Sequence, residues 1–337
     1  MPKPFILKAS RLSVAPMMEW TDRHCRVFHR QFSRHALLYT EMVTASGVVR
    51  GGADWLYRHD PVEHPLALQL GGSEPGLLAE AVRRAVPFGF CEINLNVGCP
   101  SDRVQSGAFG ACLMREPALV GDCVAAMIEA AGPEGPEITV KCRIGVDEQD
   151  PEQALPAFVE HVAACGVRHF AIHARMAWLD GLSPKENRTI PPLNYPLVRR
   201  IKQARPDLEI VLNGGVQSLD DAAAHLDWAD GVMIGRAAYH DPAAILGGAD
   251  ALITGQPIAS VAAEQAVRAM YPYIEAQLGR GTRLHQITRH MLGAFNGRPG
   301  ARRWRRVLSE GAHRDGANIA LIEQALAEVS APRQAAE

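Results

Sequence analysis

The sequence has no run of about 18 consecutive apolar residues, so it predicts no membrane-spanning helix. Residues 1–5 lack the apolar core and the small-residue cleavage site of a signal peptide. The seven cysteines are odd in number and include no CxxC pair, which argues against a disulfide framework and against a zinc site. We therefore expect a cytoplasmic protein with free thiols and no bound metal.

The sequence also lacks an excess of charge of either sign. Its net charge is -2, and 47% hydrophobic with 21% charged residues is ordinary for a globular protein. The basic residues are nevertheless clustered. Between Arg280 and Ser309 there are eight arginines and no Asp or Glu, with Trp304 among them. Clustered arginine beside an aromatic residue available for stacking indicates contact with a nucleic-acid backbone. The alternative is an ordinary solvated helix face.

Short β-rich apolar runs alternate with helix-like segments, such as 77–85 and 118–131, along most of the chain. The eight runs cover residues 12–16, 38–43, 66–70, 90–97, 138–143, 169–173, 209–213 and 231–235. This alternation predicts an α/β protein with a parallel sheet, and eight units are the size of a (β/α)8 TIM barrel. A doubly wound open sheet is the rival. We favour the barrel because every run ends in polar residues, which a barrel gathers around one mouth.

The pattern changes after residue 250. Residues 253–257 read as a linker, and no further strand signal follows. Helical periodicity covers 261–277, 283–295, 301–308 and 317–329, which predicts a small helical bundle. We therefore expect a barrel domain over residues 1–250 and a helical domain over 258–330.

The run 90–97 ends at the turn Gly98-Cys99-Pro100, which exposes a thiol. The small residues of 106–111 follow shortly after, and their flexibility lets a flat ligand approach closely. A cysteine in this position at a strand end suggests a catalytic group. The alternative is a small buried apolar side chain, because free cysteines are among the most buried residues.

Glycine and charge follow the seventh and eighth runs, where barrels commonly bind phosphate. Asn213-Gly214-Gly215 is a weak signal by itself, because a glycine pair is usually only a turn. With Gly235-Arg236 after the next strand it becomes a signal for a phosphorylated cofactor.

Lys141 and His173 also lie on strands that end at the predicted mouth. An ammonium on an apolar strand must face a ligand or be paired inside the barrel, for instance with Glu41. His173 is either a satisfied core histidine or a functional residue two positions before Arg175. The connection 175–195 is unusually long and contains Lys and Arg residues, so it is either a solvated face or a contact for an anionic partner.

Taken together, the motifs resemble those of the tRNA-dihydrouridine synthases, and most closely the A-type subfamily of bacteria. The matching segments are 13–24 (SVAPMMEWTDRH), 38–42 (LYTEM), 94–101 (NLNVGCPS), 173–175 (HAR), 182–188 (LSPKENR), 213–215 (NGG), 235–236 (GR) and 299–305 (PGARRWR). The resemblance extends from about residue 11 to about residue 310.

This resemblance implies an FMN-dependent barrel enzyme with NADPH as the reductant and the D-loop of tRNA as the substrate, at uridines 20 and 20a. The expected product is 5,6-dihydrouridine, with hydride from the flavin at C6 and a proton from Cys99 at C5. The residues expected to hold FMN are Pro16, Met17, Met18, Gln69, Lys141, His173, Asn213, Gly214, Gly215, Gly235 and Arg236.

The resemblance also suggests which residues contact the tRNA. We expect Asn96 to read the uracil edge, Arg175 to hold a neighbouring phosphate or carbonyl, and the loop 101–110 to close over the base. The candidates for contacts with the tRNA backbone are Lys185, Arg188, Arg298, Arg302 and Arg303. We expect the enzyme to be a monomer.

Two other readings remain open. An FMN-dependent barrel oxidoreductase acting on a free small pyrimidine would share the phosphate site and the cysteine, but it gives no reason for the arginines of 280–306. A non-enzymatic RNA-binding protein on a barrel scaffold would explain those arginines. It gives no reason for Lys141, His173 and Cys99 at one mouth.

Overall fold

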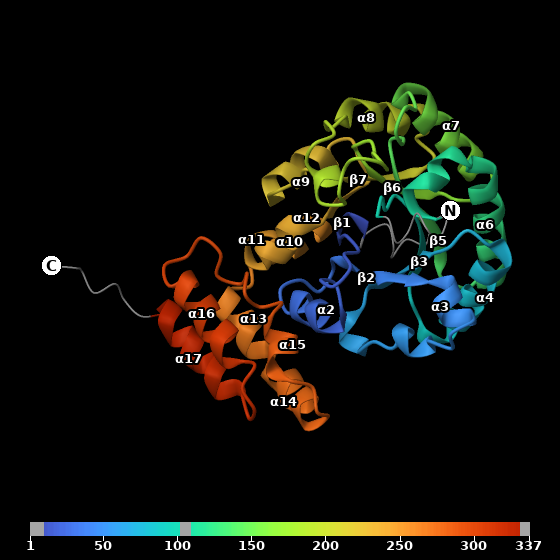
Figure 1. Ribbon diagram of the computed structural model, residues 1–337. Coiled ribbons are helices and arrows are strands. Elements are labelled where there is room, and N and C mark those ends of the chain that lie inside the picture. The colour runs from blue at the N-terminus through green and yellow to red at the C-terminus, as the bar shows by residue number, and fades with distance from the viewer. Residues whose placement is uncertain (1–9, 102–108, 331–337) are drawn as a thin grey trace.

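Eight parallel strands close into a barrel in the computed structural model, which describes residues 10–101 and 109–330 (Figure 1). The strands are β1 (Leu12–Val14), β2 (Leu37–Thr44), β3 (Leu66–Gly71), β4 (Glu92–Val97), β5 (Glu137–Arg143), β6 (His169–His173), β7 (Glu209–Asn213) and β8 (Gly231–Ile234). They follow one another in chain order, and β8 pairs with β1. The predicted TIM barrel is confirmed, and closure excludes the open sheet.

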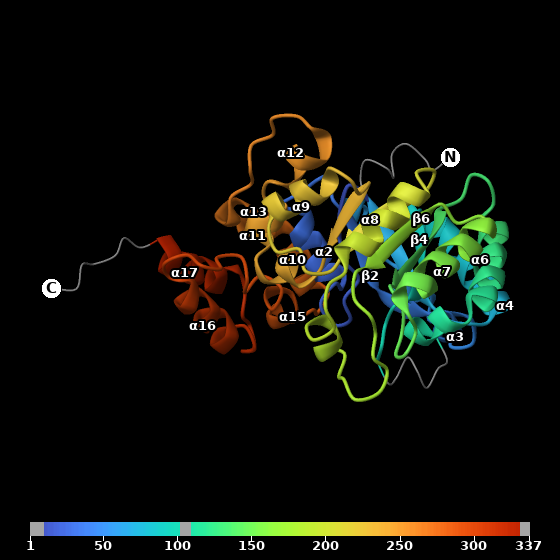
Figure 2. The same ribbon diagram turned by 90° about the horizontal axis from the view of Figure 1, so that it is seen from above.

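Helices surround the barrel on its outside (Figure 2). They are α2 (Arg23–Arg30), α3 (Ala45–Val49), α4 (Pro75–Ala85), α6 (Pro117–Ala131), α7 (Pro151–Ala164), α8 (Tyr195–Ala204), α9 (Leu219–Leu226), α10 (Arg236–His240), α11 (Pro242–Leu246) and α12 (Ala249–Thr254). Short 3-10 turns lie at η1 (Asp54–Tyr57), η2 (Pro61–Glu63), η3 (Val86–Phe88), η4 (Gly110–Arg115) and η5 (Glu186–Arg188). Six of these helices begin at a side-chain cap: α2, α3, α7, α8, α9 and α11, from Asp22, Thr44, Asp150, Asn194, Ser218 and Asp241 respectively.

Alternation along the strands separates two sets of side chains. Apolar residues that point outward pack under the helices, while an inner layer fills the barrel itself. The inner layer consists of Ala15, Leu37, Tyr39, Ala67, Ala171, Val211 and Met233, all buried. Polar residues share the barrel interior with it. The parallel register sets Gln69 beside Asn94 and Asn94 beside Thr139, so three polar side chains from three strands become neighbours.

Five helices follow the barrel, and they lie together on one side of it (Figure 1). They are α13 (Ala263–Ala269), α14 (Tyr271–Gly279), α15 (Leu284–Thr288), α16 (Ala301–Gly311) and α17 (Ile319–Ser330). The single helix predicted over 261–277 is wrong, because Pro272 starts a new helix after Met270. The helix predicted over 283–295 ends at Thr288, and the chain continues in tight turns.

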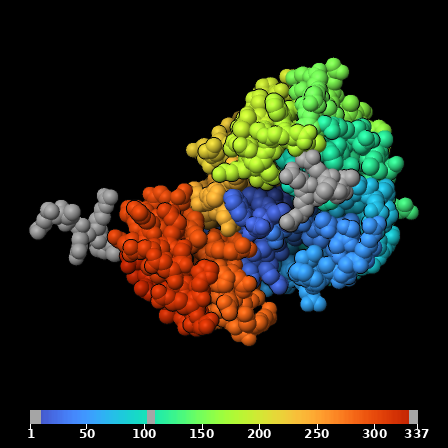
Figure 3. Space-filling model, viewed as in Figure 1, coloured from blue at the N-terminus to red at the C-terminus, as the bar shows by residue number. Residues whose placement is uncertain are grey.

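These C-terminal helices pack against α2 and α10 (Figure 3). The carboxylate of Asp22, at the start of α2, accepts hydrogen bonds from Arg289 at 2.6 Å and from His290 at 3.0 Å. Tyr239 of α10 lies 3.2 Å from the other ring nitrogen of His290, and it stacks on Trp20 with ring centroids 4.4 Å apart. Among the helices that the structure describes, none has the length and apolarity that a bilayer crossing needs.

Candidate active site

A cavity of about 720 Å³ opens at the carboxyl ends of the strands. That volume suits a cofactor-sized molecule. The cavity gathers all eleven residues that we expected to hold FMN, together with Asn96, Cys99 and Arg188. These residues come from segments spread over more than 200 positions of the chain, and the barrel brings them together because its strands end at one rim.

Side chains on two strands hold the turn that carries Cys99. The Asn96 side-chain oxygen accepts hydrogen bonds from the backbone N–H of Gly98 at 2.9 Å and of Cys99 at 3.0 Å. Arg143, at the end of β5, donates to the Gly98 carbonyl at 3.1 Å. The Cys99 sulfur lies 3.4 Å from the Ser101 hydroxyl oxygen. The thiol is therefore presented at the cavity by a turn fixed on both sides.

The cavity is basic. Four of its lining residues carry an ammonium or guanidinium group, and none of its described lining residues is acidic. Burial lowers the pKa of Lys141 to about 8, and the neighbouring charge of Arg143 adds to this effect. Within residues 10–101 and 109–330 no carboxylate pairs with Lys141. Glu41 instead accepts a hydrogen bond from the backbone of Glu19, so the pairing of Lys141 with Glu41 is wrong.

His173 is held neutral. Burial lowers the pKa of its imidazole well below the ordinary value, and the charges of Arg143 and Lys141 lower it further. Its Nδ1 is buried without a hydrogen-bond partner among the described residues. Such an atom costs free energy unless a ligand satisfies it. His173 lines the cavity, so a bound molecule is the group that could satisfy this nitrogen.

Backbone glycines beside His173 form another part of the cavity lining. Gly214 and Gly215 have φ angles of 102° and 80°, a conformation that other residues rarely adopt. The Tyr195 hydroxyl donates to the Gly214 carbonyl at 2.8 Å and fixes this turn. Arg236 starts α10 nearby and donates to the Arg188 carbonyl at 3.0 Å. Glycine backbone and two arginines at one place can hold a phosphate group.

These features fit FMN. The glycine wall and Arg236 match its phosphate, and Lys141 and Gln69 offer an ammonium and an amide to the ring edge. The orphaned Nδ1 of His173 and the uncompensated charge of Lys141 are the observations of this structure that call for a polar, anionic ligand.

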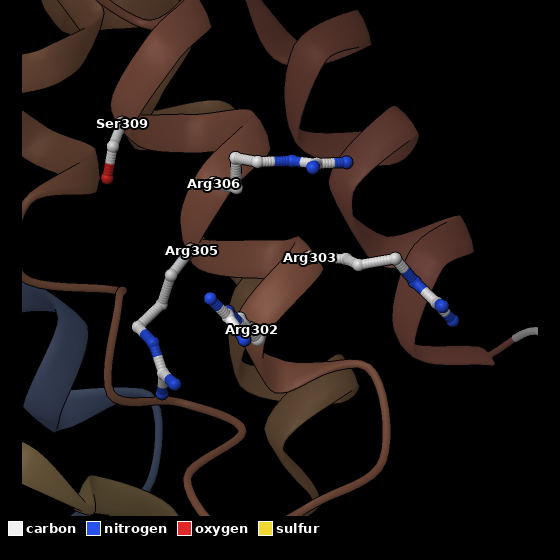
Figure 4. A pocket seen from close by; sticks show the side chains of 5 residues that line it. All are labelled: Arg302, Arg303, Arg305, Arg306 and Ser309. Atoms are coloured by element: carbon white, nitrogen blue, oxygen red, sulfur yellow. The ribbon is translucent and has the colours of Figure 1, made fainter.

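A second basic region lies on α16 (Figure 4). A shallow cavity of about 580 Å³ is lined by Arg302, Arg303, Arg305, Arg306 and Ser309. Arg303 and Arg306 extend to the same side of the helix in this view, and Arg305 extends in another direction. Arg303 pairs with Glu328 at 2.7 Å. The other three make no ion pair with any carboxylate of the described residues.

The structure corrects part of the expected nucleic-acid surface. Trp304 is fully buried, packs edge-on against Phe295 and donates its N–H to the Met291 carbonyl, so its prediction as a stacking residue is wrong. Arg298 is exposed but paired with Glu264. Arg175 lies outside the cavity lining and donates to backbone carbonyls of its own loop.

Lys185 is exposed, on the same loop as Arg188. Most of the loop 101–110 that we expected to close over the base lies outside the described residues. No described contact tests the expected tRNA contacts, which stay predictions for Asn96, Arg175, Lys185, Arg188, Arg298, Arg302 and Arg303.

Sequence reasoning missed Arg143, which holds the Cys99 turn and is almost fully buried. Its signal was an arginine at a strand end beside Lys141. It also passed over Arg305 and Arg306, which share the α16 cavity with Arg302. In both cases the missed residues lie within a few positions of residues that the sequence predicted for the site. Only the fold shows which neighbouring side chains face the same cavity.

The fold and the site define a parallel eight-stranded barrel with a thiol at the mouth of a cavity whose described lining residues include four basic and no acidic ones. A solved structure supports the barrel fold. A homologue of old yellow enzyme from Zymomonas mobilis has a TM-score of 0.52 at 15% identity, over 76% of this chain and 92% of that one. At this identity the likeness shows the fold alone.

The chain belongs to the dihydrouridine synthase family: the family described as "Dihydrouridine synthase (Dus)" matches residues 13–330. The protein named tRNA-dihydrouridine(20/20a) synthase of Xanthomonas axonopodis pv. citri is 58% identical over 94% of this chain and 93% of its own length. The protein of the same name in Escherichia coli K12 is 54% identical, over 94% of this chain and 91% of its own.

Proposed function

We propose that this protein reduces uridine to 5,6-dihydrouridine in the D-loop of tRNA, at positions 20 and 20a, with FMN as cofactor and NADPH as reductant. The names of its relatives supply the substrate and the positions. The observation that carries the chemistry is the Cys99 turn, which presents a thiol at a cofactor-sized cavity with four basic and no acidic lining residues among those described.

The cavity residues divide the work of binding. Gly214, Gly215 and Arg236 hold the FMN phosphate, since backbone N–H groups and a guanidinium are the usual partners of phosphate. Lys141 and Gln69 bind the edge of the ring system, and His173 donates or accepts there as a neutral imidazole. The ammonium of Lys141 stabilises negative charge at this edge.

FMN held in this cavity would, once reduced, supply the hydride that C6 of the uracil gains. Cys99 then donates its proton to C5, so the thiol rather than the thiolate is the working form, and solvent later returns the proton to sulfur. Hydride and proton together account for the two hydrogens that the product gains. Arg143 and Asn96 keep the turn in place while the proton moves.

Basic residues that can meet the tRNA backbone lie at the cavity and on the C-terminal helices. The target base leaves its stack to enter the cavity, at a cost of a few kcal/mol. Arg188 at the cavity and Lys185 on the same loop meet the backbone nearby. The C-terminal helices, which we assign to a helical tRNA-binding domain over residues 258–330, supply Arg302 with Arg305 and Arg306.

The test separates the tRNA enzyme from its rival. Purified holoenzyme is reduced by NADPH without oxygen and then mixed with unmodified tRNA transcript or with free uridine, while the flavin absorbance is followed. Rapid reoxidation by tRNA alone, with dihydrouridine mapped to positions 20 and 20a, is the expected result. Equal reoxidation by free uridine favours a pyrimidine oxidoreductase, and a protein that binds no FMN contradicts the proposal.

A further inference from the structure

A chain of hydrogen bonds between side chains runs through the interior of the barrel. It starts at Glu92, on β4, whose side chain is fully buried. One of its oxygens, Oε1, accepts hydrogen bonds from the Tyr39 hydroxyl at 2.5 Å and from the Thr139 hydroxyl at 2.6 Å. Because Thr139 donates its only hydroxyl hydrogen to Glu92, its oxygen is left as an acceptor for the next residue.

Three amides continue the chain toward the cavity. The Asn94 amide nitrogen donates to Thr139 at 2.7 Å, and the Gln69 amide nitrogen donates to Asn94 at 2.9 Å. The Asn96 amide nitrogen donates to Gln69 at 3.1 Å. The register explains the contacts, since Gln69, Asn94 and Thr139 lie side by side on β3, β4 and β5.

The chain of hydrogen bonds ends at the Cys99 turn. The Asn96 oxygen accepts from the backbone N–H groups of Gly98 and Cys99, as described above. Backbone N–H groups can only donate, so the Asn96 oxygen must face them and its nitrogen must face Gln69. At the other end, the Thr139 hydroxyl donates to Glu92, so its oxygen must accept from the Asn94 amide nitrogen. Both ends therefore require the same donor-to-acceptor direction along the hydrogen bonds. Every amide between the two ends therefore has a single allowed orientation.

We propose that Glu92, Thr139 and Asn94 are positioning residues that fix the amide orientations of Gln69 and Asn96, and through Asn96 the turn that presents the Cys99 thiol. None of the three lines the cavity. Gln69 keeps one free N–H and one free lone pair for the cavity, so a reversed amide would exchange donor for acceptor there. The proposal rests on the proposed function only for its catalytic consequence, since the ordering of Gln69 and Cys99 is a property of the barrel.

The other oxygen of Glu92 supports this assignment. Its Oε2 is buried with no hydrogen-bond partner among the described residues, so the carboxylate is an expensive group at this position. An apolar residue would fill the space at lower cost. A buried acceptor that is retained despite this desolvation cost fits a role in setting the donor-to-acceptor direction of the hydrogen bonds.

Thr139→Val tests the chain, because valine has nearly the shape of threonine and lacks the hydroxyl. We expect kcat of the holoenzyme to fall about tenfold while KM for tRNA stays unchanged, because a small misplacement of reacting groups lowers the rate and the tRNA surface is untouched. The circular dichroism of the bound flavin changes, and so does the rate at which iodoacetamide alkylates Cys99. Thr139→Ser restores all three.

Tyr39→Phe is the matched control. It removes the other hydrogen bond to the same Glu92 oxygen but leaves the line from Glu92 to Cys99 intact. A merely structural role for the buried carboxylate predicts equal effects of the two substitutions, whereas the proposal predicts a kcat effect for Thr139→Val alone. Wild-type kcat, flavin dichroism and alkylation rate in Thr139→Val would overturn it.

A second variant and two measurements that need no tRNA keep the proposal testable. If Thr139→Val does not fold, Thr139→Ala removes the same hydroxyl and is measured by the same assays. If the wild-type protein does not reduce tRNA, the proposed function fails, but the flavin dichroism and the alkylation of Cys99 need no tRNA and still test the chain.

Discussion

The cavity at the barrel mouth and the arginine-rich C-terminal helices are both basic, but their charges are arranged differently. In the cavity, Lys141 is desolvated and has no carboxylate partner among the described residues. In the C-terminal helices, three of the eight arginines between Arg280 and Ser309 pair with acidic residues that lie outside this stretch. Asp22 pairs with Arg289, Glu264 with Arg298, and Glu328 with Arg303.

Whether a basic group is buried without a carboxylate or exposed and paired with one determines how its positive charge acts. A buried ammonium without a carboxylate carries a desolvation cost that an anionic ligand can repay, so the charge marks a binding site. An exposed guanidinium that is already paired with a carboxylate has its charge offset by that partner, so it contributes less to a long-range attraction. Local sequence alone cannot distinguish these cases, because the partner of a charge comes from a distant part of the chain.

The largest effect is expected at the thiol that the cavity presents. Cys99→Ala should lower the turnover of tRNA by about 10²–10⁴-fold, the usual worth of a positioned general acid, because C5 loses its proton donor. FMN and tRNA affinities should stay near the wild-type values, as measured by fluorescence titration and filter binding. Cys165→Ala, a thiol outside the cavity lining, is the control. Normal turnover in Cys99→Ala would remove the proton-donor assignment.

The next effect concerns the uncompensated charge itself. Lys141→Met should weaken FMN binding by about 10–100-fold, because a charged hydrogen bond is worth roughly 1.5–3 kcal/mol. Lys185→Met, an exposed lysine outside the cavity lining, should leave FMN affinity unchanged. Isothermal titration calorimetry measures both. Equal losses in the two variants would show that the cavity ammonium has no special part in binding.

The same lysine predicts a dependence on pH. The pKa of Lys141 is about 8 in the folded, FMN-free protein, whereas the ordinary value of 10.5 applies to the unfolded chain. Between pH 8 and pH 10.5 the unfolded chain therefore binds more protons than the folded one. The free energy of unfolding of the FMN-free protein should therefore rise with pH across this window, and the Lys141→Met variant should lack this contribution. FMN affinity of the wild type should fall over the same range as the ammonium is lost. Urea unfolding at several pH values measures the first effect.

The smallest effect compares two neighbouring arginines of α16. Arg302→Ala should lower tRNA affinity several-fold and reduce the slope of log K against log salt by about 0.7–0.9, the loss of one phosphate contact. Arg303→Ala should change both quantities less, because Glu328 already neutralises its charge. A larger loss for Arg303 than for Arg302 would mean that this ion pair opens when tRNA binds, and the comparison drawn here would fail.

Much of this molecule could be predicted from the sequence. The eight predicted runs match the eight strands to within two residues at their ends, because an apolar run between turn residues is a local signal. The residues expected to hold FMN meet in one cavity, since parallel strands end at one rim. The prediction that Trp304 is a stacking residue was wrong for a physical reason. An aromatic residue among arginines suggests an exposed position, but on α16 Trp304 occupies the buried face.

The sequence by itself determined the order of strands and helices, the polar ends of the strands and the thiol that follows β4, because these depend on neighbouring residues. Only the tertiary structure decided which charges are paired and which amides face one another. Asp22 lies 267 positions from Arg289, and Thr139 lies 45 from Asn94. A hydrogen bond or an ion pair needs contact within a few ångströms, and such contacts between distant residues exist only after the barrel closes and the C-terminal helices pack against it.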